Sequence, residues 1–186
     1  MNGVFFIRHA ETDMAGTFCG HSNPPVNVRG REQIQKLISA LIGEDIKCVF
    51  TSDLERAVST AGTLADALAV PCVTKRNLRE INFGNWEGLT WQRIQELDKA
   101  YAHRWAEAYP KLPAPNGESF ADFQTRVIAE VTEILNSSDR RQAAVVTHGG
   151  VMRVVLQVMC GLPENEAWEL TKPYCSFFKY PRGVTP

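Results

Sequence analysis

The chain has no long apolar run and no excess of charge of one sign. None of its apolar stretches approaches the roughly 18 residues that a membrane-spanning helix needs. Twenty lysines and arginines stand against 21 aspartates and glutamates, so no overall field favours nucleic acid or anionic lipid as a partner. Met1–Gly3 is too short a lead into the first apolar segment for a signal peptide, and we therefore expect a cytoplasmic protein.

Cysteine is also sparse and shows no pattern. The five cysteines are odd in number and contain no C-x-x-C pair, which disfavours a disulfide framework and a structural zinc site. Cys48 and Cys72 lie in apolar stretches, where we expect small core residues. With 44% hydrophobic and 22% charged residues, the chain has the composition of one globular domain, which we place at residues 1–186.

Short apolar segments alternate with segments of helical periodicity along the chain. This alternation is typical of βα units around a mostly parallel sheet. We expect strands over residues 4–7, 48–50, 70–74 and 143–146. The sequence therefore predicts an α/β fold, a three-layer α/β/α sandwich with a mostly parallel central sheet.

The predicted helices each have one apolar face. Ser52 or Asp53 is a candidate cap for the helix that follows the second strand. Spacings of three and four residues place one set of side chains on the buried face of each helix. These sets are Ile34, Leu37, Ile38 and Leu41; Leu54, Val58, Ala61, Leu64 and Leu68; Phe120, Phe123, Val127, Val131 and Ile134; and Val151, Val154, Val155 and Val158.

Residues 82–118 differ in amino-acid composition from the rest of the chain. Three of the four tryptophans, Trp86, Trp91 and Trp105, fall there together with several prolines. We predict a helical, aromatic-rich cover insertion. Its aromatic side chains either cover a cleft or pack on the core, and the two interpretations do not exclude each other.

Arginine and histidine side chains follow three of the predicted strands. Arg8 and His9 come directly after the first strand. Arg56 lies one turn into the helix after the second, and His148 follows the last. Carboxyl ends of parallel strands share one sheet edge, so these side chains should meet there. Two guanidiniums and two imidazoles without a carboxylate suit a phosphate dianion better than a cation, so we expect no metal. Gly149 adds backbone N–H groups at a helix start, which also favour an anion.

Other signatures of phosphate and hydrolase chemistry do not fit. The chain has no G-x-x-x-x-G-K-[ST] loop, and no cysteine is followed six positions later by an arginine. The H-x-E at His9 has no P-C-x-x-C downstream. A near match to G-x-S-x-G at residues 117–121 lacks the final glycine and does not follow a strand. A histidine is left as the expected nucleophile.

Four motifs follow one another along nearly the whole chain. Residues 4–12 read V-F-F-I-R-H-A-E-T, and residues 51–61 contain S-D-L-E-R-A and T-A. Residues 78–88 read L-R-E-I-N-F-G-N-W-E-G, and residues 145–150 read V-V-T-H-G-G. In this order and spacing they resemble the motifs of the histidine phosphatase superfamily, also called the phosphoglycerate-mutase-like proteins.

The resemblance implies a phosphomonoesterase that acts through a phosphohistidine. His9 would be the nucleophile that takes the phosphoryl group. Arg8, Arg56 and His148 would hold the phosphoryl oxygens. Glu80 would be the acid that protonates the leaving alkoxide and then, once ionised, activates the water that cleaves the phosphoenzyme. The resemblance implies no cofactor.

Three positions depart from the family pattern. Ala10 replaces the usual glycine after the histidine, which is tolerable only where the backbone does not need a positive φ. Ala15 stands where many members carry an asparagine, which puts one phosphate hydrogen bond in doubt. Asn23 stands where aspartate is common, and we expect its capping or loop-ordering role to persist without the charge.

The loop after Thr12, the compact length and the segment at residues 116–120 are most similar to the alpha-ribazole phosphatase branch of the family. That resemblance implies alpha-ribazole 5'-phosphate, an intermediate of cobalamin biosynthesis, as substrate. A phosphoglycerate mutase, a broad-specificity sugar-phosphate phosphatase and a non-catalytic phosphate- or partner-binding module are the alternatives. We expect a small-molecule phosphate monoester as partner and neither nucleic acid nor membrane. The choice between monomer and homodimer stays open.

Overall fold

A five-stranded sheet forms the centre of the molecule, in the order β3-β2-β4-β1-β5. The computed structural model describes residues 3–137 and 142–181. Four strands run parallel and β5 is antiparallel to β1, which confirms the predicted, mostly parallel sheet. The strands are β1 (Gly3–Arg8), β2 (Ile46–Thr51), β3 (Cys72–Thr74), β4 (Gln142–Thr147) and β5 (Phe177–Pro181).

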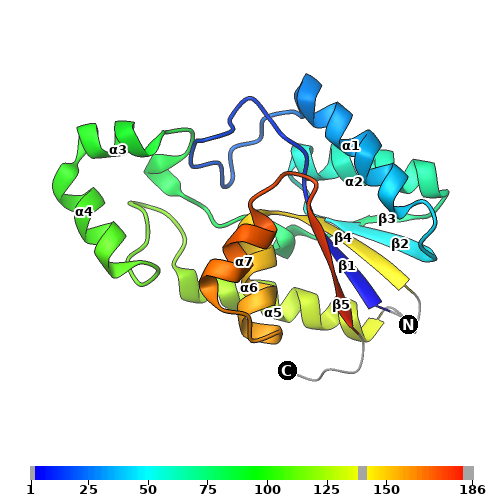
Figure 1. Ribbon diagram of the computed structural model, residues 1–186. Helices are drawn as coiled ribbons and strands as arrows, with labels where there is room; N and C mark the ends of the chain where they lie inside the picture. The colour runs from blue at the N-terminus through cyan, green and yellow to red at the C-terminus, as the bar shows by residue number, and fades with distance from the viewer. Residues whose placement is uncertain (1–2, 138–141, 182–186) are drawn as a thin grey trace.

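Alternation along the strands divides the core into two layers. Val4 and Phe6 of β1 belong to one hydrophobic cluster, and Phe5 and Ile7 to the other. Helices α1 (Val28–Leu41) and α2 (Glu55–Leu68) cover the Phe5 face, whereas α5 (Phe120–Ser137) and α6 (Gly149–Val154) cover the opposite face (Figure 1). The fold is therefore the predicted three-layer α/β/α sandwich.

The last part of the chain adds elements that sequence periodicity does not reveal. A π-helical turn at Val155–Met159 continues α6, and α7 (Glu164–Thr171) follows it. β5 then pairs with β1 at one edge of the sheet, where Phe177 is exposed. An edge strand of five residues that contains Lys179 lacks the continuous apolar run of a central strand, which is why it was not predicted.

The cover insertion carries two short helices that extend away from the sheet (Figure 1). These are α3 (Trp91–Leu97) and α4 (Lys99–Ala108). Trp86 is buried among them, and its ring centroid lies 5.2 Å from that of Trp105 at a steep angle. The insertion thus has a small aromatic core of its own, and edge-to-face ring pairs of this kind stabilise it beyond simple burial.

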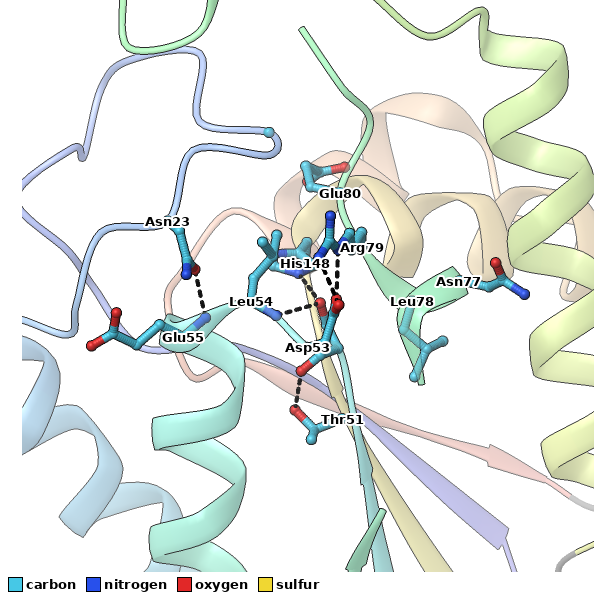
Figure 2. A network of polar contacts seen from close by, with 12 residues as sticks. Asn23, Thr51, Asp53, Leu54, Glu55, Asn77, Leu78, Arg79, Glu80 and His148 are labelled. Atoms are coloured by element: carbon cyan, nitrogen blue, oxygen red, sulfur yellow. Dashed lines mark hydrogen bonds and ion pairs between the residues drawn. The ribbon is translucent and has the colours of Figure 1, made fainter. Parts of the chain in front are cut away.

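Helix α2 shows where the predictions for single side chains are wrong. Val58 is 41% exposed, because the buried stripe of the helix includes Arg56 and Thr60 and is turned accordingly. The helix begins at Glu55, and neither Ser52 nor Asp53 is its N-cap. The carboxamide of Asn23, from a distant loop, accepts a hydrogen bond of 2.7 Å from the Glu55 N–H instead (Figure 2).

Two further predictions of burial are also wrong. Val158, in the π-helical turn, is 44% exposed. Cys72 is exposed because β3 is a three-residue strand at the edge of the sheet, and Cys48 is only half-buried. All five cysteines are free thiols. Within residues 3–137 and 142–181, no helix has the length and apolar character needed to span a membrane.

Candidate active site

The parallel strands β1 and β4 end at one point, and residues at their ends form a cluster of cationic and imidazole side chains with one residue of α2. Arg8 and His9 leave β1, and His148 leaves β4. The ring centroids of His9 and His148 are 5.0 Å apart. Arg56 reaches the same point from α2, with its Nε 3.2 Å from His9 Nε2. The structure thus brings together four side chains that are spread over most of the sequence.

His9 is buried, and its ring is oriented by its neighbours. Its Nδ1 lies 2.7 Å from the carbonyl oxygen of Ala10, which can only accept a hydrogen bond. Nδ1 therefore carries the proton, and the lone pair of the neutral ring is on Nε2, where Arg56 donates to it. Burial, with help from the guanidiniums of Arg56 and Arg8, lowers the pKa of His9 well below its ordinary value. The ring is therefore neutral at neutral pH.

The Arg56 side chain is completely buried and is aligned by backbone carbonyls. Its terminal nitrogens donate to the carbonyl oxygens of Ser22 at 2.6 Å, Gly20 at 2.7 Å and Cys19 at 3.3 Å. Burial lowers the pKa of Arg56, but an arginine stays charged under these conditions. The guanidinium is thus a fixed positive charge at the site.

Glu87, outside the predicted site, holds the loop that aligns Arg56. Its carboxylate accepts hydrogen bonds from the backbone N–H groups of Gly20, His21 and Ser22 at 2.7 to 3.1 Å, and one from the Ser22 hydroxyl at 2.6 Å. Burial alone would raise the pKa of Glu87, but these hydrogen bonds outweigh it and lower that pKa. Glu87 is therefore ionised and structural.

Two buried nitrogen atoms at the site have no hydrogen-bond partner within the described part of the chain. One is Arg8 Nε, although Arg8 Nη1 donates to the carbonyls of Thr171 and Lys172 and its guanidinium lies 4.1 Å from the centre of the Tyr174 ring. The other is Nδ1 of His148. Buried polar atoms are almost always paired, so these two nitrogens are available to a bound ligand.

The other nitrogen of the His148 ring contacts a hydroxyl group. His148 Nε2 lies 2.9 Å from Ser52 Oγ, which also accepts a hydrogen bond of 3.3 Å from the Leu54 N–H. Burial, followed by the charge of Arg56, lowers the pKa of His148 well below its ordinary value. The second imidazole of the site is therefore neutral as well.

Glu80 is 9% exposed and lies against the start of α6. One carboxylate oxygen accepts from the Gly150 N–H at 2.9 Å and the other from the Ile81 N–H at 3.0 Å. A Cβ atom at position 150 would lie 2.1 Å from Glu80 Oε1. Only glycine at that position lets the helix approach the carboxylate so closely.

A cavity of about 640 Å³ opens beside Glu80 and Gly150 and extends under the cover insertion. Its walls are mainly apolar, and aromatic rings form a large part of them. The aromatic residues that line it are Phe18, Phe83, Trp91, Trp105, Tyr109, Phe120, Phe123 and Trp168. Trp91 and Trp105 therefore do both things that the sequence left open: their rings pack on each other and they line a cavity next to the site.

The positions that depart from the family pattern fit the structure to different degrees. Ala10 is buried, and it is not among the non-glycine residues with positive φ in the described chain. Ala15 is exposed and offers no polar side chain.

The remaining two histidines lie outside this cluster of side chains. His103 is exposed, and its Nδ1 lies 3.5 Å from Glu107 Oε2. His21 is half-buried, and its Nε2 has no partner within the described residues.

Sequence reasoning missed three contributors to the site. Ser52 and Glu87 both stood inside recognised motifs, so their position, though not their contacts, was a usable signal. Arg126 lies on α5 between the apolar positions Phe123 and Val127, and helical periodicity assigns it no role. Within the described residues, no group of three or more histidine, cysteine, aspartate or glutamate side chains is arranged to hold a metal ion.

Comparison with known families agrees with the fold and the site. The family model of the histidine phosphatase superfamily (branch 1) matches residues 4–181. The chain belongs to this superfamily, and it is an enzyme, a phosphoric monoester hydrolase.

Individual relatives cover most of the chain at modest identity. An adenosylcobalamin/alpha-ribazole phosphatase of Escherichia coli K12 is 29% identical over 89% of this chain and 82% of its own length. A putative phosphoserine phosphatase 2 of Hydrogenobacter thermophilus is 26% identical over 91% of this chain and 84% of its own. The crystal structure of a putative alpha-ribazole-5'-P phosphatase from Escherichia coli K-12 superposes with a TM-score of 0.82 at 29% identity, covering 91% of this chain and 84% of that one.

Proposed function

We propose that the protein hydrolyses a phosphate monoester through a phosphohistidine formed on His9 Nε2. The observation that carries the proposal is the orientation of the His9 ring: its proton is held on Nδ1 by the Ala10 carbonyl, and the lone pair on Nε2 points to Arg56. A neutral imidazole with its lone pair on Nε2 is a nucleophile without prior deprotonation, once Arg56 Nε turns its hydrogen bond from that lone pair to the phosphoryl group. The adjacent guanidinium would draw a phosphoryl group onto it.

The two unpaired buried nitrogens support a phosphoryl site in front of His9. Ser52 Oγ already accepts from the Leu54 N–H, and its own hydrogen is satisfied if it donates to His148 Nε2. This arrangement leaves the proton of His148 on Nδ1, the atom without a partner. His148 Nδ1, Arg8 Nε and Arg56 would then donate to phosphoryl oxygens, and Gly149 provides side-chain-free backbone beside Arg8.

The reaction runs in two balanced steps. The lone pair of His9 Nε2 attacks phosphorus, the bond from phosphorus to the ester oxygen breaks, and the protonated carboxyl of Glu80 gives its proton to the departing oxygen. The Glu80 carboxylate then takes a proton from water, whose oxygen attacks phosphorus while the phosphorus–nitrogen bond breaks. Orthophosphate leaves, and His9 and Glu80 return to their starting states.

The first test is direct detection of the intermediate. Wild-type enzyme mixed rapidly with para-nitrophenyl phosphate labelled in the phosphoryl group should hold acid-labile, alkali-stable label. Glu80→Gln should accumulate more of it, because hydrolysis is slowed while the para-nitrophenolate leaving group needs little proton donation for the intermediate to form. His9→Asn should hold none, whereas the exposed control His103→Asn should behave as wild type. Label that persists in His9→Asn would contradict the assignment. Because Arg8 and Arg56 supply the positive charge, turnover should also persist in EDTA.

The cavity supports a bulky, flat alcohol as the other half of the ester. Its aromatic walls offer ring faces for stacking, which suits a nucleoside-like base. Arg153 is the one cationic residue among the described residues that line the cavity, so the cavity offers little to a substrate with its own carboxylate. We therefore propose alpha-ribazole 5'-phosphate as the substrate, in agreement with the names of two relatives.

A substrate panel tests this choice. We expect kcat/KM for alpha-ribazole 5'-phosphate to exceed that for 3-phosphoglycerate and phosphoserine by about 100-fold, since only the former fills the cavity. Trp105→Ala should raise KM for the nucleotide-like substrate and leave inhibition by orthophosphate unchanged, because orthophosphate does not reach the cavity. Equal or better turnover of the two acids would overturn the substrate and leave the phosphohistidine mechanism standing.

A further inference from the structure

Arg126, on α5, binds the segment of chain that carries Glu80. Its Nη1 donates to the carbonyl oxygens of Asn77 and Arg79, both at 2.8 Å. Its Nη2 donates to the carbonyl oxygen of Glu80 itself at 2.9 Å. We propose that Arg126 and its partner Glu118 are positioning residues that hold Glu80 at the place where it transfers its proton. The proposal rests on the acid role of Glu80 argued above.

The remaining donors of Arg126 are taken by Glu118. Nε donates to Glu118 Oε1 at 2.6 Å, and Nη2 donates to Oε2 at 2.8 Å. A guanidinium has five N–H groups, and these two bonds together with the three to carbonyls use all five. Arg126 therefore has no donor left for a substrate, although it lies next to the cavity wall. Its function in this geometry is to hold protein groups.

Glu118 fixes the main chain on the C-terminal side of Glu80. Its Oε2 also accepts from the Asn82 N–H at 3.2 Å, and its own N–H donates to the Asn82 carbonyl at 2.9 Å. Residues 77–80 are thus held by Arg126 and residue 82 by Glu118, so the chain is anchored before and after the carboxylate. The guanidinium also lies 4.9 Å from the centre of the Phe123 ring, which fixes its plane.

Such anchoring is needed because the segment has little regular structure of its own. After a 3₁₀ turn at Arg76–Leu78, it runs as irregular chain until Gly84. On the N-terminal side of Glu80, the Thr147 hydroxyl donates to the Leu78 carbonyl. Arg79 forms an ion pair with Asp53 (Figure 2). Neither of these fixes the main chain at Glu80 itself. A shift of the carboxyl by about 1 Å can cost about 100-fold in a step that depends on its position.

Displacement of the Glu80 carboxyl should slow the reaction of some substrates and not of others, depending on the leaving group. Proton donation matters when the leaving group is a basic alkoxide and matters little when it is para-nitrophenolate. Displacing Glu80 should therefore slow formation of the phosphoenzyme from an alkyl phosphate and spare its formation from para-nitrophenyl phosphate. A loss of fold or of the phosphate clamp would slow both alike.

The experiment measures single-turnover phosphoenzyme formation from para-nitrophenyl phosphate and from an alkyl phosphate. Arg126→Gln and Glu118→Gln should slow the alkyl reaction about 10- to 100-fold and the aryl reaction less than about threefold. Arg126→Lys keeps the charge but cannot reach the same set of acceptors, and it should remain closer to Arg126→Gln than to wild type. Val131→Ala is the matched control, because it removes core packing from the same helix and leaves the ratio of the two rates unchanged.

Glu80→Gln, in the same assay, separates the acid role of Glu80 from the positioning role of Arg126 and Glu118. If it slows both substrates equally, the acid role of Glu80 is wrong and the positioning role falls with it. If it slows only the alkyl reaction while Arg126→Gln and Glu118→Gln do not, the acid role stands and the positioning role is wrong. Full recovery in Arg126→Lys would also overturn the proposal, since charge alone would then suffice. If Arg126→Gln does not fold, Glu118→Gln decides the matter.

Discussion

At the scale of single residues, the chemistry depends on which ring nitrogen of each histidine carries the proton. For His9 a backbone carbonyl makes the choice, since it can only accept. For His148 the neighbour is the hydroxyl of Ser52, which can donate or accept. One buried hydroxyl therefore determines whether His148 offers a proton or a lone pair to a bound phosphate.

Replacing Ser52 with alanine should release His148 from its tautomer. Nitrogen-15 NMR of histidine-labelled wild-type protein should show His148 protonated on Nδ1, with exposed His103 as the internal reference. In Ser52→Ala the proton should redistribute toward Nε2, and orthophosphate should bind about 10-fold more weakly because one donor is lost. A wild-type ring protonated on Nε2, or unchanged phosphate affinity in the variant, would contradict the assignment.

At the scale of elements, two helices are adapted to the site at the expense of ordinary amphipathic patterning. Helix α2 buries Arg56 and Thr60 on its inner face, and the Thr60 hydroxyl accepts a hydrogen bond of 3.0 Å from the Ala10 N–H. Helix α6 begins with two glycines, and the second, Gly150, lets it approach Glu80. In α2 the site decides which side chains the inner face buries, and in α6 it decides which residue can stand next to the carboxylate.

Gly150→Ala should therefore damage the acid more than the fold. The added Cβ would fall 2.1 Å from Glu80 Oε1, so the carboxylate must move, and turnover of alkyl phosphates should fall at least about 10-fold. The control is Gly62→Ala in the interior of α2, where a Cβ meets nothing within 4 Å. That change should retain activity and stabilise the protein by about 0.5–1 kcal/mol. Unimpaired turnover in Gly150→Ala would show that the approach of α6 is not critical.

At the scale of the whole molecule, a cluster of neutral imidazoles buried beside fixed positive charge makes stability depend on pH. Burial, with the neighbouring arginines, lowers the pKa of both His9 and His148 well below 6.5 in the folded state. The unfolded chain takes up protons on these rings below about pH 6.5, and the folded chain does not. Unfolding is therefore favoured progressively as the pH falls below that value.

Each ring should remove about 1.4 kcal/mol of stability per pH unit in this range. For a chain of this size the two together correspond to a fall of about 5–10 °C in Tm per pH unit between pH 6.5 and 5. Thermal unfolding in a series of buffers measures the slope. His148→Gln should reduce the slope by about half, and the exposed control His103→Gln should leave it unchanged. A flat profile in wild type would show that the rings are not buried in neutral form.

How much could be predicted from sequence depends on the range of the interactions. The strands β1 and β4 are buried almost throughout and β2 has the short apolar segment 48–50, so local composition predicted all three to within a few residues. The edge strand β5 and the true cap of α2 were missed, because each depends on a partner far away in the chain. Asn23 caps α2 from more than 30 positions upstream, and no local pattern contains that information.

The amino-acid sequence by itself determined which catalytic side chains are present. It also determined that they lie at one edge of the sheet, since the carboxyl ends of parallel strands share that edge. Only the tertiary structure decided how that chemistry is directed. The contact of Arg56 with His9 Nε2, the close approach of Gly150 to Glu80 and the five hydrogen bonds of Arg126 all join residues from separate elements. The physical reason is that hydrogen bonds depend on distances and angles between atoms, which are set only when the helices and strands are packed together.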